Sequence, residues 1–177
     1  MKMDDVSNTN PSSRRLRLWL VDDDDGLRGL IAELLGRSDI IECSRQFFSA
    51  ESALDVLAQE SPPDIILLDL NMPGMSGVEA IRPIKRLAGG TRVFIMTVFY
   101  DSIEVSRARS AGASGFVLKR DDWQEVIARL QDESADWAAE SPKPGAPASL
   151  PARSRMTPGL QPYLAGAEAV VIVGAGT

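Results

Sequence analysis

Short apolar runs alternate with amphipathic stretches of helical length from residue 16 to residue 132. The apolar runs predict five strands, at residues 16–21, 42–48, 64–69, 92–97 and 115–119. After each strand, apolar residues recur at helical spacing and predict a helix. Regular alternation of this kind favours an α/β fold in which helices cover both faces of a parallel sheet. Because crossovers between parallel strands are right-handed, a doubly wound five-stranded sheet is the natural closure.

Capping residues predict where several of these helices begin and end. Ser49 is positioned to cap the second helix, and Asp101 with Glu104 has the spacing of a capping box at the start of the fourth. Gly112 follows the fourth helix, where glycine commonly ends a helix. Pro83 lies inside the predicted third helix and removes a backbone donor there. We therefore expect a kink or an early break at Pro83, at a distance from the site.

The composition excludes several kinds of chemistry. The 177 residues include no histidine, so the chain can form neither a Ser-His-Asp or Cys-His nucleophile pair, nor a histidine-ligated zinc site, nor a phosphohistidine. Cys43 is the only cysteine, so no internal disulfide forms and the cytoplasm is the expected compartment. The net charge of −6 disfavours nucleic acid as a partner. No apolar run approaches the roughly 20 residues that span a membrane.

The two ends of the chain differ in composition from the segment between them. Residues 1–15 are polar and show no apolar periodicity, so we expect a disordered lead without a signal peptide. Six prolines lie between residues 142 and 162, among many Ala and Ser residues. We expect residues 133–177 to form a largely disordered tail without a complete output domain.

The residues at the ends of the predicted strands carry the chemistry. In a doubly wound sheet, the functional site lies at the carboxyl ends of the strands. The first strand is followed by Asp22–Asp25, the third leads through Asp69 to Asn71, the fourth ends at Thr97 and the fifth at Lys119. Separate segments therefore bring several carboxylates, one hydroxyl and one ammonium to one edge of the sheet.

Carboxylates gathered in this way need a compensating charge. Two unit charges about 4 Å apart repel by about 4 kcal/mol at an effective dielectric constant of about 20. A divalent cation relieves the repulsion, and oxygen ligands without imidazole or thiolate favour Mg²⁺. Mg²⁺ with a carboxylate, a hydroxyl and a lysine is suited to phosphoryl transfer, in which the carboxylate attacks in line. At an ordinary pKa of about 3.9, the Asp69 carboxyl is ionised at neutral pH and needs no general base.

Four ordered motifs resemble a known family. VDDDDGLRGLIAELL, DIILLDLNMPGMSGVEAI, FIMTVF and AGASGFVLK together resemble the receiver domain of two-component response regulators. NMPGMSG, TVF and AGASGFVLK are similar to the NarL/FixJ branch in particular. The resemblance covers residues 16–132 and implies a flavodoxin-like sheet with strand order 2-1-3-4-5.

The resemblance implies a role for each residue of the metal site. Asp69 is the phosphoacceptor, and Asp22 and Asp23 hold Mg²⁺ together with it, with Asp23 favoured as a direct ligand. Asn71 gives its backbone carbonyl to the same ion. Self-catalysed phosphorylation and dephosphorylation are then the only expected reactions, and the chain is not otherwise an enzyme.

The resemblance also implies a conformational switch. Thr97 hydrogen-bonds a phosphoryl oxygen, Lys119 pairs with the phosphoryl group or with Asp69, and the Phe116 rotamer follows Thr97. The fourth helix, fifth strand and fifth helix then shift between two packings that a partner distinguishes. The implied partners are a sensor histidine kinase or a phosphotransfer protein, and a downstream protein target. A second copy could bind through this face or through the first and fifth helices.

Simpler explanations exist for some of these residues. Asp22–Asp25 could be a solvated cluster that caps the following helix, and this is what we expect of Asp24 and Asp25 themselves. Phe116 could equally be a core residue, since a Phe beside a buried strand usually is.

Two other functions would use related residues. A NarL-type transcriptional regulator would continue into a helix-turn-helix domain, and Met156-Thr157-Pro158 resembles the start of one. The residues after Pro158 include no basic side chain to contact DNA, so this output domain would be truncated or lost. A hydrolase of the haloacid-dehalogenase type would also attack from Asp69, but that family typically has a second Asp where this chain has Asn71.

Overall fold

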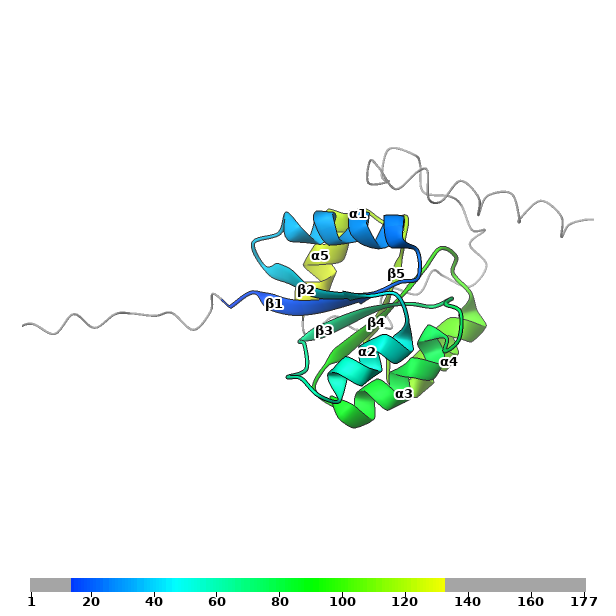
Figure 1. Cartoon of the computed structure of the whole chain (residues 1–177). Helices are drawn as coiled ribbons and strands as arrows, with labels where there is room; N and C mark the ends of the chain where they lie inside the picture. The colour runs from blue at the N-terminus through cyan, green and yellow to red at the C-terminus, as the bar shows by residue number, and fades with distance from the viewer. Residues whose placement is uncertain (1–13, 133–177) are drawn as a thin grey trace, which may run out of the picture.

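The computed structural model describes residues 14–132, which form one parallel sheet with helices on both faces (Figure 1). The strands are β1 (Leu16–Val21), β2 (Ile41–Phe47), β3 (Ile65–Asp69), β4 (Arg92–Thr97) and β5 (Gly115–Leu118). The helices are α1 (Asp25–Gly36), α2 (Ala50–Leu57), α3 (Gly77–Leu87), α4 (Ser102–Ala111) and α5 (Trp123–Gln131). The strand order is β2-β1-β3-β4-β5, with every neighbouring pair parallel. The predicted doubly wound fold and its strand order are confirmed.

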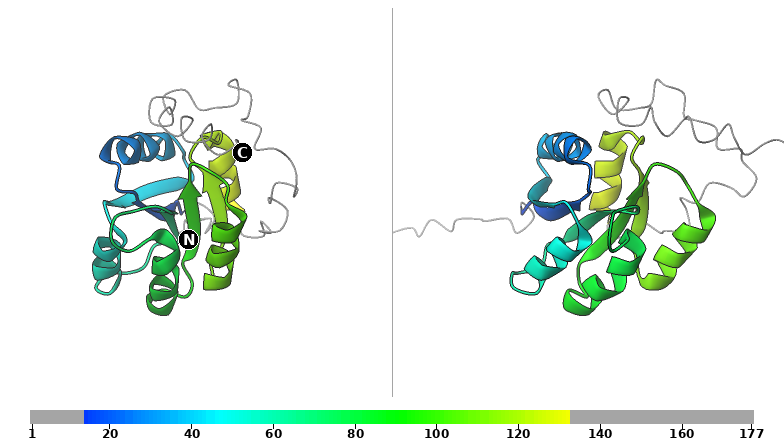
Figure 2. Two further views of the ribbon diagram at one scale, coloured as in Figure 1. Left: turned by 90° about the vertical axis from the view of Figure 1, so that its right-hand side faces the viewer. Right: turned by 45° about the vertical axis from the view of Figure 1, so that its right-hand side comes forward.

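The helices divide between the two faces of the sheet. α1 and α5 cover one face, and α2, α3 and α4 cover the other (Figure 2). Along β3, Ile65 and Leu67 pack toward α1 and α5, whereas Ile66 and Leu68 pack toward α2, α3 and α4. All four side chains are fully buried, and each contributes about 1.5–3 kcal/mol to stability. β3 therefore holds its last residue, Asp69, in a fixed position.

The predicted caps at Ser49, Asp101 and Gly112 are present, but only the Asp101 half of the predicted capping box is found, and the Glu104 carboxylate pairs with Arg107 instead. Ser49 caps α2 by accepting a hydrogen bond from the backbone N–H of Ser52. Asp101 caps α4 by accepting from the N–H groups of residues 103 and 104. Gly112 ends α4 with a φ of 103°, in the left-handed region that favours glycine.

Pro83 does not end α3. The helix continues past Pro83 to Leu87, so the predicted early break is wrong. Ile81 and Ile84, on either side of the proline, are buried against the sheet. Their burial offsets the roughly 3 kcal/mol that proline costs inside a helix. Tertiary packing thus overrides the local preference of proline.

The described part of the chain begins at Arg14, whose guanidinium pairs with Asp64 at 2.5 Å. Arg15 donates to the backbone carbonyl of Asp39 at 3.1 Å. The preceding lead and the tail at 133–177, including the Thr-Pro pair, lie outside the described residues. Between residues 14 and 132, none of the helices has the length and apolar character needed to span a membrane.

Candidate functional site

Four buried polar side chains gather at the carboxyl edge of the sheet. Asp22 follows β1, Asp69 ends β3, Thr97 ends β4 and Lys119 follows β5, and each is at most 5% exposed. The Lys119 Nζ lies 2.9 Å from the Asp22 Oδ2 and 3.0 Å from the Asp69 Oδ2. The structure therefore brings two of the predicted carboxylates and the predicted lysine into direct contact, as the strand-end rule leads one to expect.

Burial changes the protonation of these groups. Desolvation raises the pKa of Asp69 to about 6, and the Lys119 charge opposes this rise while the Asp22 charge adds to it. Desolvation also raises the pKa of Asp22, again against the attraction of Lys119. The pKa of Lys119 would fall through burial, but the two carboxylates outweigh that effect and raise it. The expectation that Asp69 titrates near its ordinary pKa is wrong, because the end of β3 is buried.

Asp23 completes an acidic cluster at this edge. It is exposed, unlike Asp22, and one carboxylate oxygen from each of Asp22, Asp23 and Asp69 lies within 4.8 Å of the others. Two oxygens bound to one Mg²⁺ lie about 3 Å apart when adjacent and about 4 Å apart when opposite, given Mg–O distances of about 2.0–2.1 Å. Because all three ligands are oxygens, the cluster fits a hard cation such as Mg²⁺.

The loop between β1 and α1 holds Asp22 in place. The Asp22 Oδ1 accepts from the Asp24 N–H at 2.9 Å, and the Asp22 backbone carbonyl accepts from the Arg28 guanidinium at 2.7 Å. Asp24 caps α1 through the Leu27 N–H, and Asp25 pairs with Arg28. Asp24 and Asp25 therefore have the roles that the sequence predicts. Arg28 was not predicted, although its spacing from Asp25 on a helix is a signal for an ion pair.

The loop after β3 packs closely against the backbone of Asp69. Gly77 donates its N–H to the Leu70 carbonyl at 3.0 Å. A Cβ at Gly77 would lie 2.2 Å from the Asp69 carbonyl oxygen, so the close approach requires glycine. Asn71 is exposed, and its backbone N–H hydrogen-bonds the Asp69 side chain. The predicted role of the Asn71 carbonyl as a metal ligand stays a prediction.

Thr97 and Phe116 are packed in one particular arrangement. The Thr97 hydroxyl donates to the Phe99 carbonyl at 3.1 Å and so closes the turn after β4. Phe116 is 9% exposed, and its ring meets the Tyr100 ring edge-on, with centroids 5.4 Å apart. Thr97 and Phe116 share the lining of a cavity of only about 10 Å³. Phe116 thus packs as a core residue in this conformation.

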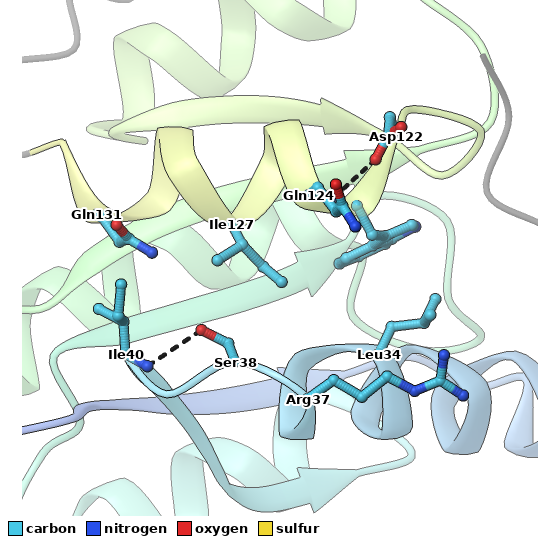
Figure 3. A pocket seen from close by; sticks show the side chains of 9 residues that line it. Leu34, Arg37, Ser38, Ile40, Asp122, Gln124, Ile127 and Gln131 are labelled. Carbon is cyan, nitrogen blue, oxygen red and sulfur yellow. Dashed lines mark hydrogen bonds between the residues drawn. The ribbon is translucent and has the colours of Figure 1, made fainter.

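An open groove of about 510 Å³ lies elsewhere, between the end of α1 and α5 (Figure 3). Its apolar lining comes from Leu34, Ile40, Trp123 and Ile127. Neither the acidic cluster nor Lys119 contributes to it. The groove is therefore a candidate contact surface and not a site for phosphoryl chemistry.

Comparison with known proteins agrees with the geometry at the sheet edge. Residues 18–131 match the family model of the response regulator receiver domain. The chain belongs to this family. It is a receiver domain of the NarL/LuxR-like kind, the phosphoacceptor module of two-component systems.

The relatives include full-length regulators. The nitrate/nitrite response regulator NarL of Escherichia coli K12 is 29% identical over 130 residues, which cover 73% of this chain and 58% of NarL. NarP of the same strain is 34% identical over 121 residues, covering 68% of this chain and 56% of NarP. GacA of Pseudomonas aeruginosa is 30% identical over 128 residues, covering 72% and 59%. The chain thus spans a little more than half the length of these regulators.

Solved structures show the same similarity. A two-component response regulator of the LuxR family from Aurantimonas sp. superposes with a TM-score of 0.63 at 28% identity, over 88% of this chain and 99% of that one. The signal receiver domain of a NarL response regulator from Mycobacterium tuberculosis gives a TM-score of 0.59 at 26% identity, over 65% of this chain and 92% of that one. The branch that the motifs predicted is confirmed.

Proposed function

We propose that Asp69 is the phosphoacceptor of this receiver and that it takes a phosphoryl group from a sensor histidine kinase or a phosphotransfer protein in the cytoplasm. The observation that carries the proposal is the position of Lys119, 2.9 Å from Asp22 and 3.0 Å from Asp69, beside the third carboxylate of Asp23. A lysine and an acidic cluster side by side suit a small tetrahedral anion next to a divalent cation.

Asp22, Asp23, the Asp69 carboxylate and the Asn71 backbone carbonyl would hold Mg²⁺. When bound, the ion neutralises oxygens of the incoming phosphoryl group. The all-oxygen donor set and the 4.8 Å spacing of the carboxylate oxygens support this assignment. Asp23 is the favoured direct ligand because it is exposed at the rim, whereas Asp22 already pairs with Lys119.

The transfer forms a bond between an Asp69 oxygen and phosphorus while the P–N bond of the phosphohistidine donor breaks, and the electron pair leaves with the imidazole. With a pKa of about 6, Asp69 is largely ionised at neutral pH and needs no general base. Lys119 exchanges Asp69 for a phosphoryl oxygen and keeps Asp22. The product is a mixed anhydride that water hydrolyses, so the reactions of this chain are the self-catalysed gain and loss of one phosphoryl group.

Thr97 and Phe116 would convert phosphorylation into a signal. The Thr97 hydroxyl would leave the Phe99 carbonyl for a phosphoryl oxygen, and Phe116 would turn toward the space that Thr97 vacates. α4, β5 and α5 would then repack and present a changed surface to a downstream protein target. Ile103 of α4 is 63% exposed and is an apolar anchor available on that surface.

The groove between α1 and α5 supports the first and fifth helices as the contact with a second copy (Figure 3). Ile127 and Ile40 both line this groove, and Ile40 is 47% exposed. Arg37 and Asp122 line it too, so a two-fold-related copy offers each an opposite charge. In sedimentation velocity, Ile127→Asp should abolish a dimer that Ile103→Asp leaves intact. The reverse result would assign the dimer to the face of α4, β5 and α5.

The two alternative functions are not favoured. The family match at residues 18–131 describes the receiver domain alone, so phosphoacceptance is the function that it supports, and it includes no helix-turn-helix domain for DNA binding. The same match disfavours a hydrolase of the haloacid-dehalogenase type, as does Asn71 in place of a second aspartate.

Incubation with acetyl phosphate and Mg²⁺ tests the proposed function. The intact mass of the protein should rise by one phosphoryl group, and neither the protein in EDTA nor Asp69→Asn should gain it. Continuous release of phosphate from phosphate esters, dependent on Asp69, would support the hydrolase instead.

A further inference from the structure

Glu51, in the first turn of α2, reaches across to the loop that joins β3 to α3. Its Oε1 accepts a hydrogen bond from the backbone N–H of Met75 at 2.8 Å. The same oxygen lies 2.6 Å from the place that a Cβ at Gly74 would occupy, and Gly74 has a φ of +79°. The loop therefore needs glycine at residue 74 for its backbone conformation, and a side chain there would displace the Glu51 carboxylate from the loop.

The charge on Glu51 suits this contact. Backbone N–H groups of Glu51 itself and of Met75 lower the pKa of the Glu51 carboxyl, with a smaller contribution from the Ser49 side chain. The carboxylate form therefore accepts the loop's hydrogen bond at neutral pH. α2 and α3 lie side by side on one face of the sheet (Figure 1). The contact therefore ties α2 to the loop that leads into α3.

The other contacts of this loop lie toward its two ends. At its far end, Ser76 and Glu79 form a reciprocal capping box at the start of α3. Near its beginning, Met72 is buried in the same apolar cluster as Phe47. Asn71 itself is exposed, and its backbone N–H hydrogen-bonds Asp69. Asn71 thus lies between Asp69 and the part of the loop that contacts Glu51.

We infer that Glu51 is a positioning residue for the metal site: through Met75 and Gly74 it holds the loop in the conformation that presents the Asn71 carbonyl beside Asp69. The inference rests on the proposed function, in which that carbonyl binds Mg²⁺. A loop that is already ordered loses less conformational entropy when the ion binds. Residues that orient metal ligands typically change metal affinity by about 10–100-fold when they are replaced. We expect the lower end of this range, because Glu51 acts through the loop and not on a ligand directly.

Isothermal titration of the unphosphorylated protein with Mg²⁺ tests the inference. Glu51→Ala should raise the Kd for Mg²⁺ by roughly 10-fold with little change in Tm, since residue 51 is exposed. Glu51→Gln keeps an oxygen acceptor for Met75 without the charge and should recover most of the affinity. Asp55→Ala removes a carboxylate from an exposed position of the same helix and is the control for loss of negative charge alone.

The outcomes separate this inference from the proposed function. If the wild-type protein binds Mg²⁺ and Glu51→Ala binds it equally well, the positioning role is overturned and the proposed function stands. If Glu51→Gln or Asp55→Ala loses as much affinity as Glu51→Ala, the effect is one of charge and the positioning role is again overturned. If the wild-type protein binds no Mg²⁺, both the proposed metal site and this inference are overturned.

Discussion

The Lys119 ammonium lies 3.0 Å from the Asp69 carboxylate, in surroundings where the two residues are 5% and 4% exposed. At such burial each charge depends on the other, because a lone charge loses its hydration without compensation. The group proposed to hold the phosphoryl oxygens thus already stabilises the ionised acceptor. Phosphorylation would exchange one anionic partner of Lys119 for another in the same place.

Replacing Lys119 by Ala should expose this dependence. The variant leaves the buried carboxylates of Asp22 and Asp69 without their cation, and breaking a buried pair in this way typically costs about 3–5 kcal/mol. Urea unfolding in EDTA at neutral pH should show a loss of this order. Saturating Mg²⁺ should reduce the loss, since the ion supplies positive charge to the same carboxylates. A variant as stable as the wild-type protein in EDTA would contradict the account.

The raised pKa of Asp69 predicts how stability depends on pH. In the folded protein the pKa of Asp69 is about 6, above its ordinary value, so proton binding by Asp69 favours folding. The stabilisation from this protonation is fully present below about pH 4. It is lost as the pH rises through about 6. Asp69→Asn removes the buried charge and should be more stable than the wild-type protein at neutral pH in EDTA. The gain should reach about 3 kcal/mol, because the pKa of Asp69 rises from its ordinary value to about 6 on folding. The difference should shrink toward pH 4. Asp55→Asn changes an exposed carboxylate and is the control, which should show neither the gain in stability at neutral pH nor its decrease toward pH 4. If Asp69→Asn and the wild-type protein are equally stable across this range, the pKa of Asp69 is not raised.

A methyl group at Gly77 should displace the backbone of Asp69 and so disturb the site. Its Cβ would lie 2.2 Å from the Asp69 carbonyl oxygen, so either α3 or the end of β3 has to move. Gly77→Ala should lose about 1–3 kcal/mol and bind Mg²⁺ more weakly. The matched control is Gly29→Ala in α1, where the added methyl meets open space and should stabilise the helix by about 0.5–1 kcal/mol. Equal stability of the two variants would show that the close approach at Gly77 is unimportant.

Thr97→Val tests the switch. Valine keeps the shape of the buried side chain but removes the hydroxyl that now donates to the Phe99 carbonyl. Beryllofluoride with Mg²⁺ should change the NMR signals of the Phe116 ring and of α4 in the wild-type protein and leave them nearly unchanged in the variant. If Phe116 responds equally in both, its ring does not follow Thr97, and the simpler assignment of Phe116 as a core residue holds.

The sequence predicts the fold and the membership of the site because both follow from local patterns. Apolar runs and helical stripes define the strands and helices, and strand ends in a doubly wound sheet share one edge. The positions of Asp22, Asp69, Thr97 and Lys119 at strand ends therefore predict that they share one site. The helix caps at Ser49 and Asp101 could be predicted for the same reason, since a cap depends on residues close together in the chain.

The features that the sequence did not predict depend on contacts between residues far apart in the chain and on burial. The hydrogen bond from Met75 to Glu51 joins residues 24 positions apart and has no periodic signature. The raised pKa of Asp69 comes from desolvation, which is set by the packing of neighbouring strands. The predicted break of α3 at Pro83 was wrong for a related reason. The burial of Ile81 and Ile84 outweighs the local preference of proline against a helix.

The site of phosphorylation tests the central claim most directly. After incubation with acetyl phosphate and Mg²⁺, borohydride reduces an aspartyl phosphate to homoserine, and tandem mass spectrometry of the digested protein then locates it. The account predicts homoserine at residue 69 in the wild-type protein, and none there when EDTA replaces Mg²⁺. Homoserine at another position, or Mg²⁺-dependent labelling that persists in Asp69→Asn, would contradict it.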